Sequence, residues 1–272
     1  MVRSLWTAAT GMIAQQTNVD TIANNLSNVN TVGYKTQVNE FKSLLYQTLQ
    51  TKTTSANGET KPTSAQVGLG VRNASITTLF KNGSLLSSES PTAFAISGKG
   101  FFAVRGEDGN TYYTRNGNFQ WTREANGGVM LADSDGRPVM DSTGKAIILD
   151  ATYDASQVTV TADGTVCYPD ENNNPQSLGI TIGVYQFTNP GGLERMDSSL
   201  YQQTAASGAP INEATSATVE KSSILQNFLE GSNVQVVDEM VNMIVAQRAY
   251  EMNSKAITAS DEMLQQANNL RG

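Results

Sequence analysis

Both ends of this 272-residue chain read as long amphipathic helices, whereas the stretch between them reads as short strands and tight turns. Near the N-terminus, residues recur in steps of three and four, the spacing of a coiled-coil seam. The members are Leu5, Ala8, Met12, Gln15, Val19, Ile22, Leu26 and Val29. A chain with such a seam at both ends is typical of proteins that pack on other helices, often those of identical copies. The feature favours assembly over catalysis.

The second helix is expected over residues 232–270. Gly231 breaks the preceding chain, Ser232 is placed to cap the helix, and Gln235 would complete a capping box. The apolar stripe is diluted by polar residues, so most of its stability is expected to come from a partner. Its members are Val237, Val241, Met243, Ile244, Ala246, Tyr250, Asn253, Ile257, Ser260, Leu264 and Ala267.

The first helix, expected over residues 4–30 with Gly33 as its stop, carries carboxamides where a solvated helix normally carries Lys and Glu. They are Gln16, Asn18, Asn24, Asn25 and Asn28. Carboxamides can be buried when each finds hydrogen-bond partners, so this face is expected to be packed as well. An ordinary bundle helix with a weakly polar surface is the alternative.

The next segment is less regular. A short helix is expected around Phe41, Leu44, Leu45 and Leu49, followed by an extended connector over Thr51–Gln66, which is rich in Thr, Ser and Lys. One or two strands are expected around Leu69, Val71 and Ile76.

Residues 91–187 alternate with a period of two and are interrupted by Asn-Gly and Asp-Gly turns, the strongest short-range hairpin signals. Strands are expected at 93–96, 101–104, 111–114, 119–122, 128–132, 146–149, 158–161, 165–168 and 180–187. The chain is therefore predicted to be α+β, with long terminal helices that pair as a coiled coil and a middle domain of antiparallel sandwich or barrel-like type. The expected boundaries are 1–34 with 228–272 for the coiled coil, 35–90 and 190–227 for connectors, and 91–189 for the β-rich domain.

Composition excludes several functions. The net charge of −7 and the pI near 4.7 argue against nucleic-acid binding, because no basic stripe can meet a phosphate backbone. The chain has no histidine, which removes the commonest general base and metal ligand. It has one cysteine, Cys167, and hence no internal disulfide. No run approaches 18 apolar residues, and the N-terminus lacks the apolar core of a signal peptide. We therefore expect a cytosolic protein or one exported without a cleavable signal.

No motif supports catalysis. Cys167 lies in a strand pattern and is expected to be inert. Residues 133–136 resemble the start of a calcium loop but lack its later ligands, so a hairpin turn is favoured. The acidic turn 170–174 is interpreted as a solvated loop, and 97–100 is not a phosphate loop because no helix pattern follows it. No pair of carboxylates stands out, and no cofactor or metal is expected.

Several segments match a known family. Ile22 to Lys35, with the sequence IANNLSNVNTVGYK, resembles the N-terminal signature of the bacterial flagellar rod and hook proteins. The opening RSLWTAATGM resembles the distal-rod class of that family in particular. Further matches are GSNV from Gly231, VNMI and QRAYE in the second helix, AISGKGFF from Ala95, YTRNG from Tyr113, NPGGL from Asn189 and TAASG from Thr204. The resemblance covers nearly the whole chain.

The resemblance implies a subunit whose terminal helices form an inner coiled coil, with the β-rich domain outside. Copies would stack helically into a hollow distal rod that transmits torque to the hook and surrounds the export channel. Implied partners are identical copies, the neighbouring proximal-rod and hook-side proteins, surrounding ring proteins and the flagellar export apparatus. The implied location is the basal body in the cell envelope, reached by type III export without cleavage. The lysine- and threonine-rich Thr51–Gln66 segment departs from the distal-rod pattern.

We therefore expect a structural subunit without enzymatic activity. The alternatives are a proximal-rod or hook subunit, a cell-wall-acting enzyme, and a β-domain binding module. The residues expected to carry self-assembly are Leu5, Met12, Val19, Ile22, Asn24, Asn25, Leu26, Asn28, Val29, Val237, Val241, Ile244, Arg248, Tyr250, Ile257 and Leu264.

Overall fold

The computed structural model describes residues 2–50, 65–123, 127–150, 152–170, 174–197 and 199–270. The chain is α+β, with one long helix from each end and β-rich structure between them, as predicted. It divides into two units. The helical unit comprises Met1–Ser27, Gln37–Thr78 and Gln235–Gly272, and the β unit comprises Asn28–Thr36 and Leu79–Val234.

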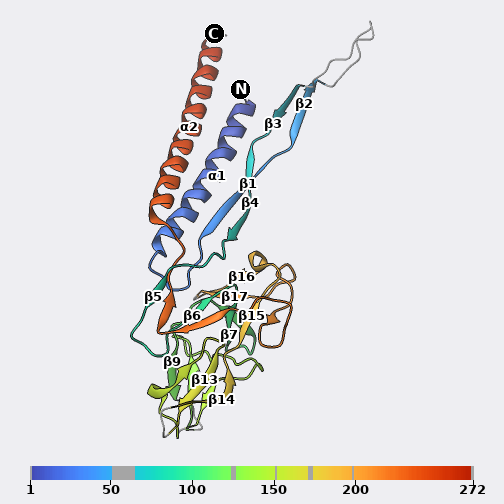
Figure 1. Ribbon diagram of the computed structural model, residues 1–272. Coiled ribbons are helices and arrows are strands. Elements are labelled where there is room, and N and C mark those ends of the chain that lie inside the picture. Colours follow the sequence, from blue (N-terminus) through green and yellow to red (C-terminus); the bar gives the residue numbers. More distant parts are fainter. Residues whose placement is uncertain are drawn as a thin grey trace. The chain divides into compact units, whose positions relative to one another are not determined.

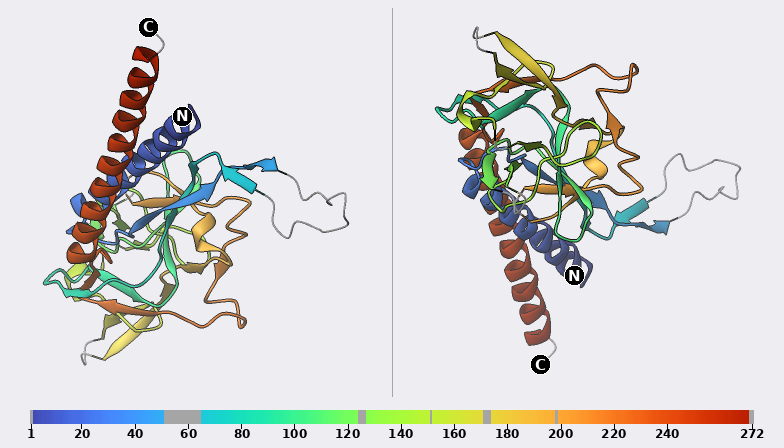
Figure 2. Two further views of the ribbon diagram at one scale, coloured as in Figure 1. Left: turned by 90° about the horizontal axis from the view of Figure 1, so that it is seen from above. Right: turned by 90° about the horizontal axis from the view of Figure 1, so that it is seen from below.

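In the helical unit, α1 (Val2–Ser27) and α2 (Val236–Asn269) lie side by side and run in opposite directions (Figures 1 and 2). The free ends of both helices consequently lie at the same end of the pair (Figure 1). No helix in the described part of the chain has the length and apolar character needed to cross a membrane.

The expected cap of the second helix is wrong. The residue that precedes α2 is Gln235, and its side chain makes no capping hydrogen bond. The Ser232 hydroxyl instead accepts a hydrogen bond from the Val234 amide, at 3.3 Å. Ser232 therefore stabilises a turn before the helix, and α2 begins four residues later than predicted. The N-terminal helix α1 ends at Ser27, before the predicted limit of residue 30.

The short helix predicted around Phe41 is also wrong, because this segment forms strands of a long two-stranded ribbon. β1 (Gln37–Ser43) pairs antiparallel with β4 (Val71–Thr78), and β2 (Tyr46–Gln50) pairs with β3 (Ala65–Gly68). The leucines and Phe41 have helical spacing, but the hydrogen bonds come from β4 and β3, the strands predicted near Leu69 and Ile76. The predicted connector falls mostly outside the described residues.

The β unit contains sixteen described strands. They are β5 (Leu85–Ser87), β6 (Phe94–Ser97), β7 (Phe101–Arg105), β8 (Thr111–Thr114), β9 (Gln120–Arg123), β10 (Val129–Ala132), β11 (Ile148–Leu149), β12 (Thr159–Val160), β13 (Thr165–Pro169), β14 (Pro175–Thr181), β15 (Val184–Gln186), β16 (Glu194–Arg195), β17 (Leu200–Gln202), β18 (Ile211–Asn212), β19 (Ser223–Gln226) and β20 (Phe228–Glu230). Two short 3-10 helices, Ala155–Gln157 and Pro190–Gly192, lie among them.

The largest sheet has the order β16-β17-β8-β7-β15-β18, and its neighbouring strands are antiparallel. Smaller sheets are β11-β10-β9, β12-β13-β14, β19-β6 and β20-β5. None of these described sheets closes into a barrel. The single strand predicted over 180–187 is divided in two, since β14 ends at Thr181 and β15 begins at Val184.

Strand β7 is buried on both faces, and the core of the β unit is built around it. Phe102 and Val104 point into one apolar cluster, and Phe101 and Ala103 point into a second. Successive side chains of a strand alternate between faces, so four consecutive apolar residues indicate burial on both sides. Several of the predicted turn signals are confirmed. Gly136 and Gly164, for example, both adopt φ of +81°, the left-handed conformation that glycine tolerates. Asn116-Gly117, however, is not a hairpin turn, because β8 and β9 do not pair with each other.

Candidate assembly surface

The two helices meet through small and polar side chains. Three pairs of residues mark the contact. The hydroxyl oxygens of Ser4 and Ser260 are 3.3 Å apart, and Asn25 donates a 3.3 Å hydrogen bond to Glu239. Between these pairs, Gly11 faces Asn253 so closely that a Cβ added to the glycine would lie 2.7 Å from the Asn253 amide nitrogen. Each pair is one or two heptads from the next along both helices. The buried residues of α2 are Glu239, Ala246 and Ser260, which belong to the same face.

The carboxamide at Asn25 joins α1 to the ribbon. Its Nδ2 donates to the carbonyl oxygen of Gln37 at 2.8 Å, and its Oδ1 accepts from the amide of Gln37 at 2.9 Å. Asn25 is only 1% exposed, and these bonds satisfy its polar atoms as burial requires. Asn24 donates to the Gln37 side chain at 3.1 Å. The packing expected for the carboxamide face is confirmed at Asn25.

The remaining predicted assembly residues differ in burial between the two helices. On the N-terminal side, Ile22 is buried and the apolar residues Leu5, Met12, Val19, Leu26 and Val29 are half-buried, as is Asn28. On α2, Ile257 is half-buried, while Val237, Val241, Ile244, Arg248, Tyr250 and Leu264 are exposed. Their role in assembly stays a prediction.

An apolar stripe runs along α2, over the face that points away from α1 and the flank next to it. We call it the outer stripe, and it consists of Val237, Val241, Ile244, Val245 and Met252. Val237 is 73% exposed, Val241 54% and Ile244 56%. Each of Val237 and Val241 lies two residues from buried Glu239, which places them about 200° around the helix from it. Exposed apolar side chains gathered on one helix surface are typical of protein interaction sites.

α1 also carries exposed large side chains. Trp6 is 68% exposed and Ile13 is 64% exposed. Trp6 lies two residues after Ser4, and Ile13 lies two residues after Gly11, and both Ser4 and Gly11 contact α2. By the same helical geometry Trp6 and Ile13 face away from α2. The helices therefore pair through small and polar residues, and several large apolar side chains, including Trp6 and Val237, remain exposed.

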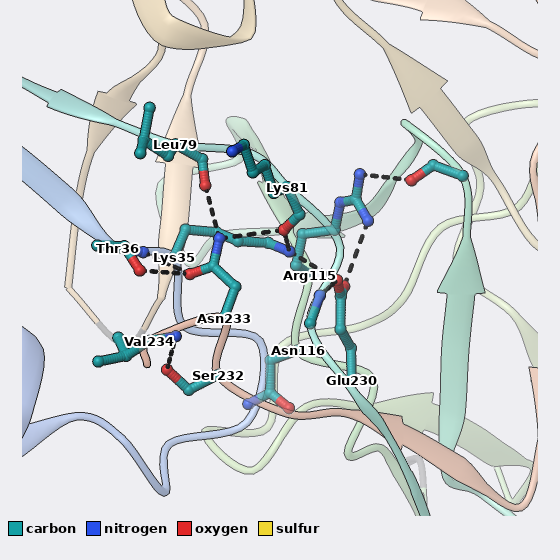
Figure 3. A network of polar contacts seen from close by, with 12 residues as sticks. Lys35, Thr36, Leu79, Lys81, Arg115, Asn116, Glu230, Ser232, Asn233 and Val234 are labelled. Atoms are coloured by element: carbon teal, nitrogen blue, oxygen red, sulfur yellow. Dashed lines mark hydrogen bonds and ion pairs between the residues drawn. The ribbon is translucent and has the colours of Figure 1, made fainter. Parts of the chain in front are cut away.

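The β unit contains a buried ionic network centred on Glu230 (Figure 3). Its Oε1 accepts from Lys35 Nζ at 2.6 Å and from the Gly83 amide at 2.9 Å, and its Oε2 lies 3.3 Å from Arg115 Nη1. Arg115 also donates to the Gly98 carbonyl at 2.9 Å. Each of the three charged side chains is at most 1% exposed.

Asn233 adds hydrogen bonds to this network. Its Oδ1 accepts from both the amide and the hydroxyl of Thr36, each at 2.7 Å. Its Nδ2 donates to the carbonyls of Leu79, at 2.9 Å, and Lys81, at 3.1 Å (Figure 3). Lys35 Nζ donates to the same Lys81 carbonyl at 2.7 Å. Three segments distant in sequence are thus joined by one connected set of hydrogen bonds.

Burial governs the electrostatics of the network. It lowers the pKa of Lys35 and of Arg115, and the negative charge of Glu230 offsets part of each shift. Arg115 also stacks over the ring of Phe101, with 4.9 Å from its guanidinium carbon to the ring centroid. A buried carboxylate between two buried cations holds segments in a fixed arrangement more than it adds net stability, because desolvation is costly.

Reasoning from periodicity and spacing did not find this network, although the signal was present. Lys35, Arg115 and Asn233 all lie in the segments that carry the family resemblance. The structure brings these segments together. Gly33 shows how closely they approach, because it has φ of +69° and a Cβ there would lie 2.7 Å from the Arg115 carbonyl carbon.

The sequence motifs considered as candidates for chemistry occupy ordinary structural positions in the described part of the chain. Cys167 is buried in β13, as expected of an inert thiol. Residues 133–136 form a turn closed by a 2.9 Å hydrogen bond from the Gly136 amide to the Asp133 carbonyl. No group of three Cys, Asp or Glu side chains among the described residues could hold a metal ion.

Three family models match the chain. Residues 5–35 match the flagella basal body rod protein, residues 95–168 match the D1 domain of the flagellar hook protein FlgE/F/G, and residues 225–270 match the C-terminal region of the flagellar basal body rod FlgEFG protein. The first and last matches contain most of α1 and all of α2, respectively.

Full-length relatives carry the same name. The flagellar basal-body rod protein FlgG of Borreliella burgdorferi is 43% identical, over 100% of this chain and 99% of its own length. FlgG of Caulobacter vibrioides is 40% identical, over 99% of this chain and 100% of its own length. FlgG of Bacillus subtilis is 36% identical over the whole of both chains.

Proposed function

Because this chain belongs to the flagellar basal-body rod protein family, we propose that it forms the distal rod by helical assembly of identical copies into a hollow shaft. The chain is a structural subunit of the rod and not an enzyme. It is part of the flagellar basal body and assembles with other flagellar axial proteins. In our proposal the shaft transmits torque to the hook and surrounds the export channel.

The outer stripe is the observation that carries this proposal. A neighbouring copy would cover Val237, Val241 and Ile244. Each Å² of apolar surface buried in this way would stabilise the contact by about 25 cal/mol. A heterologous contact that does not close, repeated from copy to copy, generates a helical filament. We therefore assign the terminal segments 1–34 and 228–272 to the assembly domain and residues 91–189 to the outer domain.

The heptad spacing of the contacts between α1 and α2 supports pairing as a coiled coil. Ser4 and Gly11, like Ser260 and Asn253, are seven residues apart, so one face of each helix is used repeatedly. Two long helices in each subunit, placed near the axis, would resist bending and twisting. The proposed neighbours in the periplasm are the proximal-rod and hook-side proteins and the surrounding rings. The chain would reach them through the export apparatus, without a cleaved signal.

Electron microscopy of the purified chain at rising concentration tests the proposal. We expect straight hollow tubes from the wild type and none from Val241→Asp, because the introduced carboxylate would be buried in the contact. Met196→Asp is the matched control, since Met196 is an exposed apolar residue of the β unit and should leave tubes intact. Curved tubes would indicate a hook subunit, and a wild type that stays monomeric at every concentration would contradict the proposal.

A further inference from the structure

The helical unit contains a cavity of about 310 Å³ between α1, α2 and β1. Its polar lining includes Gln15, Asn18 and Thr21 of α1, Asn39 of β1, and Glu239 of α2. Val245 of the outer stripe also lines it, so the cavity opens beside the surface assigned to assembly. We call it the acceptor cavity.

Two acceptors in this cavity lack a strong donor within the described chain. Asn39 is 7% exposed and its Nδ2 lies 3.4 Å from Asn73 Oδ1, but its own buried Oδ1 has no hydrogen-bond partner among the described residues. Glu239 is 8% exposed, and the hydrogen bond it accepts is the one from the neutral amide of Asn25. No described Lys or Arg forms an ion pair with it.

These two acceptors define the chemistry of the missing partner. A buried acceptor without a donor costs free energy, and a buried carboxylate without a cation costs more. Burial raises the pKa of Glu239, and the hydrogen bond from Asn25 offsets only part of that shift. A group with several N–H donors and a positive charge would satisfy both acceptors.

Arg248 carries the positive charge and the N–H donors that these two acceptors lack. It lies on α2 with Ile244 and Met252 of the outer stripe one turn to either side, and it is exposed with an exposed partner, Glu251, at 2.8 Å. A pair this exposed contributes little in the free chain. When a neighbouring copy covers the stripe, the guanidinium loses water and needs further acceptors for its five donors.

Arg248 cannot reach the acceptor cavity of its own chain. It lies nine residues after Glu239 on one continuous helix, about 14 Å along the axis and on the opposite face. In a heterologous contact, however, one residue of a copy meets a different residue of the next copy. Two groups of one helix can therefore pair between copies.

We propose that Arg248 of one copy enters the acceptor cavity of the next copy and pairs there with Glu239. The inference rests on the proposed self-assembly and identifies one contact within it. The planar guanidinium can donate to the Glu239 carboxylate and to Asn39 Oδ1 together, which a lysine ammonium matches less well. Lys255, one heptad further on, is surrounded by Glu251, Thr258 and Ala259 and would stay solvated.

Charge reversal and mixing provide the test. Alone, Glu239→Lys and Arg248→Glu each place like charges at every contact, and we expect each to raise the critical concentration for tube formation about tenfold or more. An equimolar mixture restores opposite charges at every contact when the two variants alternate. We therefore expect the mixture to form tubes within about threefold of the wild-type critical concentration, since each contact again pairs opposite charges.

Three results would overturn the inference. Tubes from either single variant at the wild-type concentration would show that the pair is not needed. Failure of the mixture, with both variants folded by circular dichroism, would show that the two residues do not meet. Rescue of Glu239→Lys by Lys255→Glu instead of Arg248→Glu would assign the contact to the lysine. If the wild type itself forms no tubes, the proposed function fails and this contact fails with it.

A neutral pair of variants covers the case in which the introduced lysine unfolds the chain. Glu239→Gln and Arg248→Gln then form a double-mutant cycle with the wild type, measured by the critical concentration. We expect the double variant to assemble about as well as the worse single variant, because the second change removes nothing further. Additive effects would contradict a direct contact.

Discussion

The helical unit and the β unit place their apolar side chains in opposite ways. In the β unit, Phe101 and Phe102 are fully buried in two apolar clusters. In the helical unit, α2 buries Glu239, Ala246 and Ser260, while its valines and Ile244 remain exposed. The β unit thus completes its core within one chain, whereas the helical unit retains apolar surface that another chain is expected to cover.

The largest difference is expected when a phenylalanine is truncated in each unit. Phe102→Ala should destabilise the chain by about 3–5 kcal/mol, because Phe102 has no exposed surface and packs edge-on against Phe119. Phe41→Ala in the helical unit should cost about 1 kcal/mol or less, because Phe41 is 42% exposed. Urea unfolding of both variants measures the difference. Equal costs would contradict the contrast between the units.

The next largest loss of stability is expected when the buried Glu230 carboxylate of the β unit is neutralised. Glu230→Gln leaves Lys35 and Arg115 buried without an anion, and we expect a loss of about 3 kcal/mol. Urea unfolding gives the loss, and hydrogen exchange should localise it to residues 28–36, 79–83 and 230–234. A variant as stable as the wild type would mean that the network does not depend on the charge of Glu230.

The seam between the helices should tolerate only small residues. Gly11→Leu would force a large side chain against Asn253 and should cost about 1–3 kcal/mol by overpacking. Ala23→Leu is the control, because Ala23 is exposed on the same helix and leucine is a good helix former. Thermal unfolding followed at 222 nm compares the two. A Gly11 variant as stable as the control would show that Asn253 moves aside at little cost and that the seam admits a larger residue.

The smallest effect on folding is expected at Glu239, with a sign opposite to that at Glu230. Burial raises the folded-state pKa of Glu239 above its ordinary value of 4.5, so the charged form is penalised in the folded chain. The penalty is complete above the folded pKa and disappears as the pH falls through that value toward 4.5. Glu239→Gln should therefore raise the midpoint of thermal unfolding at pH 7, and its advantage should vanish near pH 4.

The Glu239 variant needs a matched control. Glu262→Gln removes the same charge from an exposed position on α2 and should change the midpoint little at either pH. If Glu239→Gln is less stable than the wild type at pH 7, the carboxylate has a cationic partner in the free chain and the acceptor cavity is already satisfied.

The two units also differ in how well the sequence predicts them. In the β unit, most strands follow from period-two patterns between glycine turns such as Gly136 and Gly164, because these signals are local. In the helical unit, β1 and β2 were mistaken for a helix around Phe41, since the pairing that decides their structure comes from β4 and β3.

The site was predictable only in part, for a related reason. Heptad spacing correctly indicates the two helices, but it does not say which face of each helix pairs within the chain. Gly11 lies against Asn253, and Ser4 lies against Ser260, because glycine and serine allow the helices to approach closely, and an apolar pattern does not report such residues. The Glu230 network joins residues up to 197 positions apart, so only a resemblance or a structure can bring them together.

Hydrogen exchange of the monomer and of assembled tubes, measured by mass spectrometry, tests the central claim most directly. We expect amides in α2, particularly around Val241 and Ile244, to gain protection of about tenfold or more on assembly, since a partner then opposes local opening of the helix. Amides in β7 and β8 should be equally protected in both states. Equal protection of α2 in monomer and tubes, or a gain confined to β7 and β8, would contradict the claim that copies complete the helical unit.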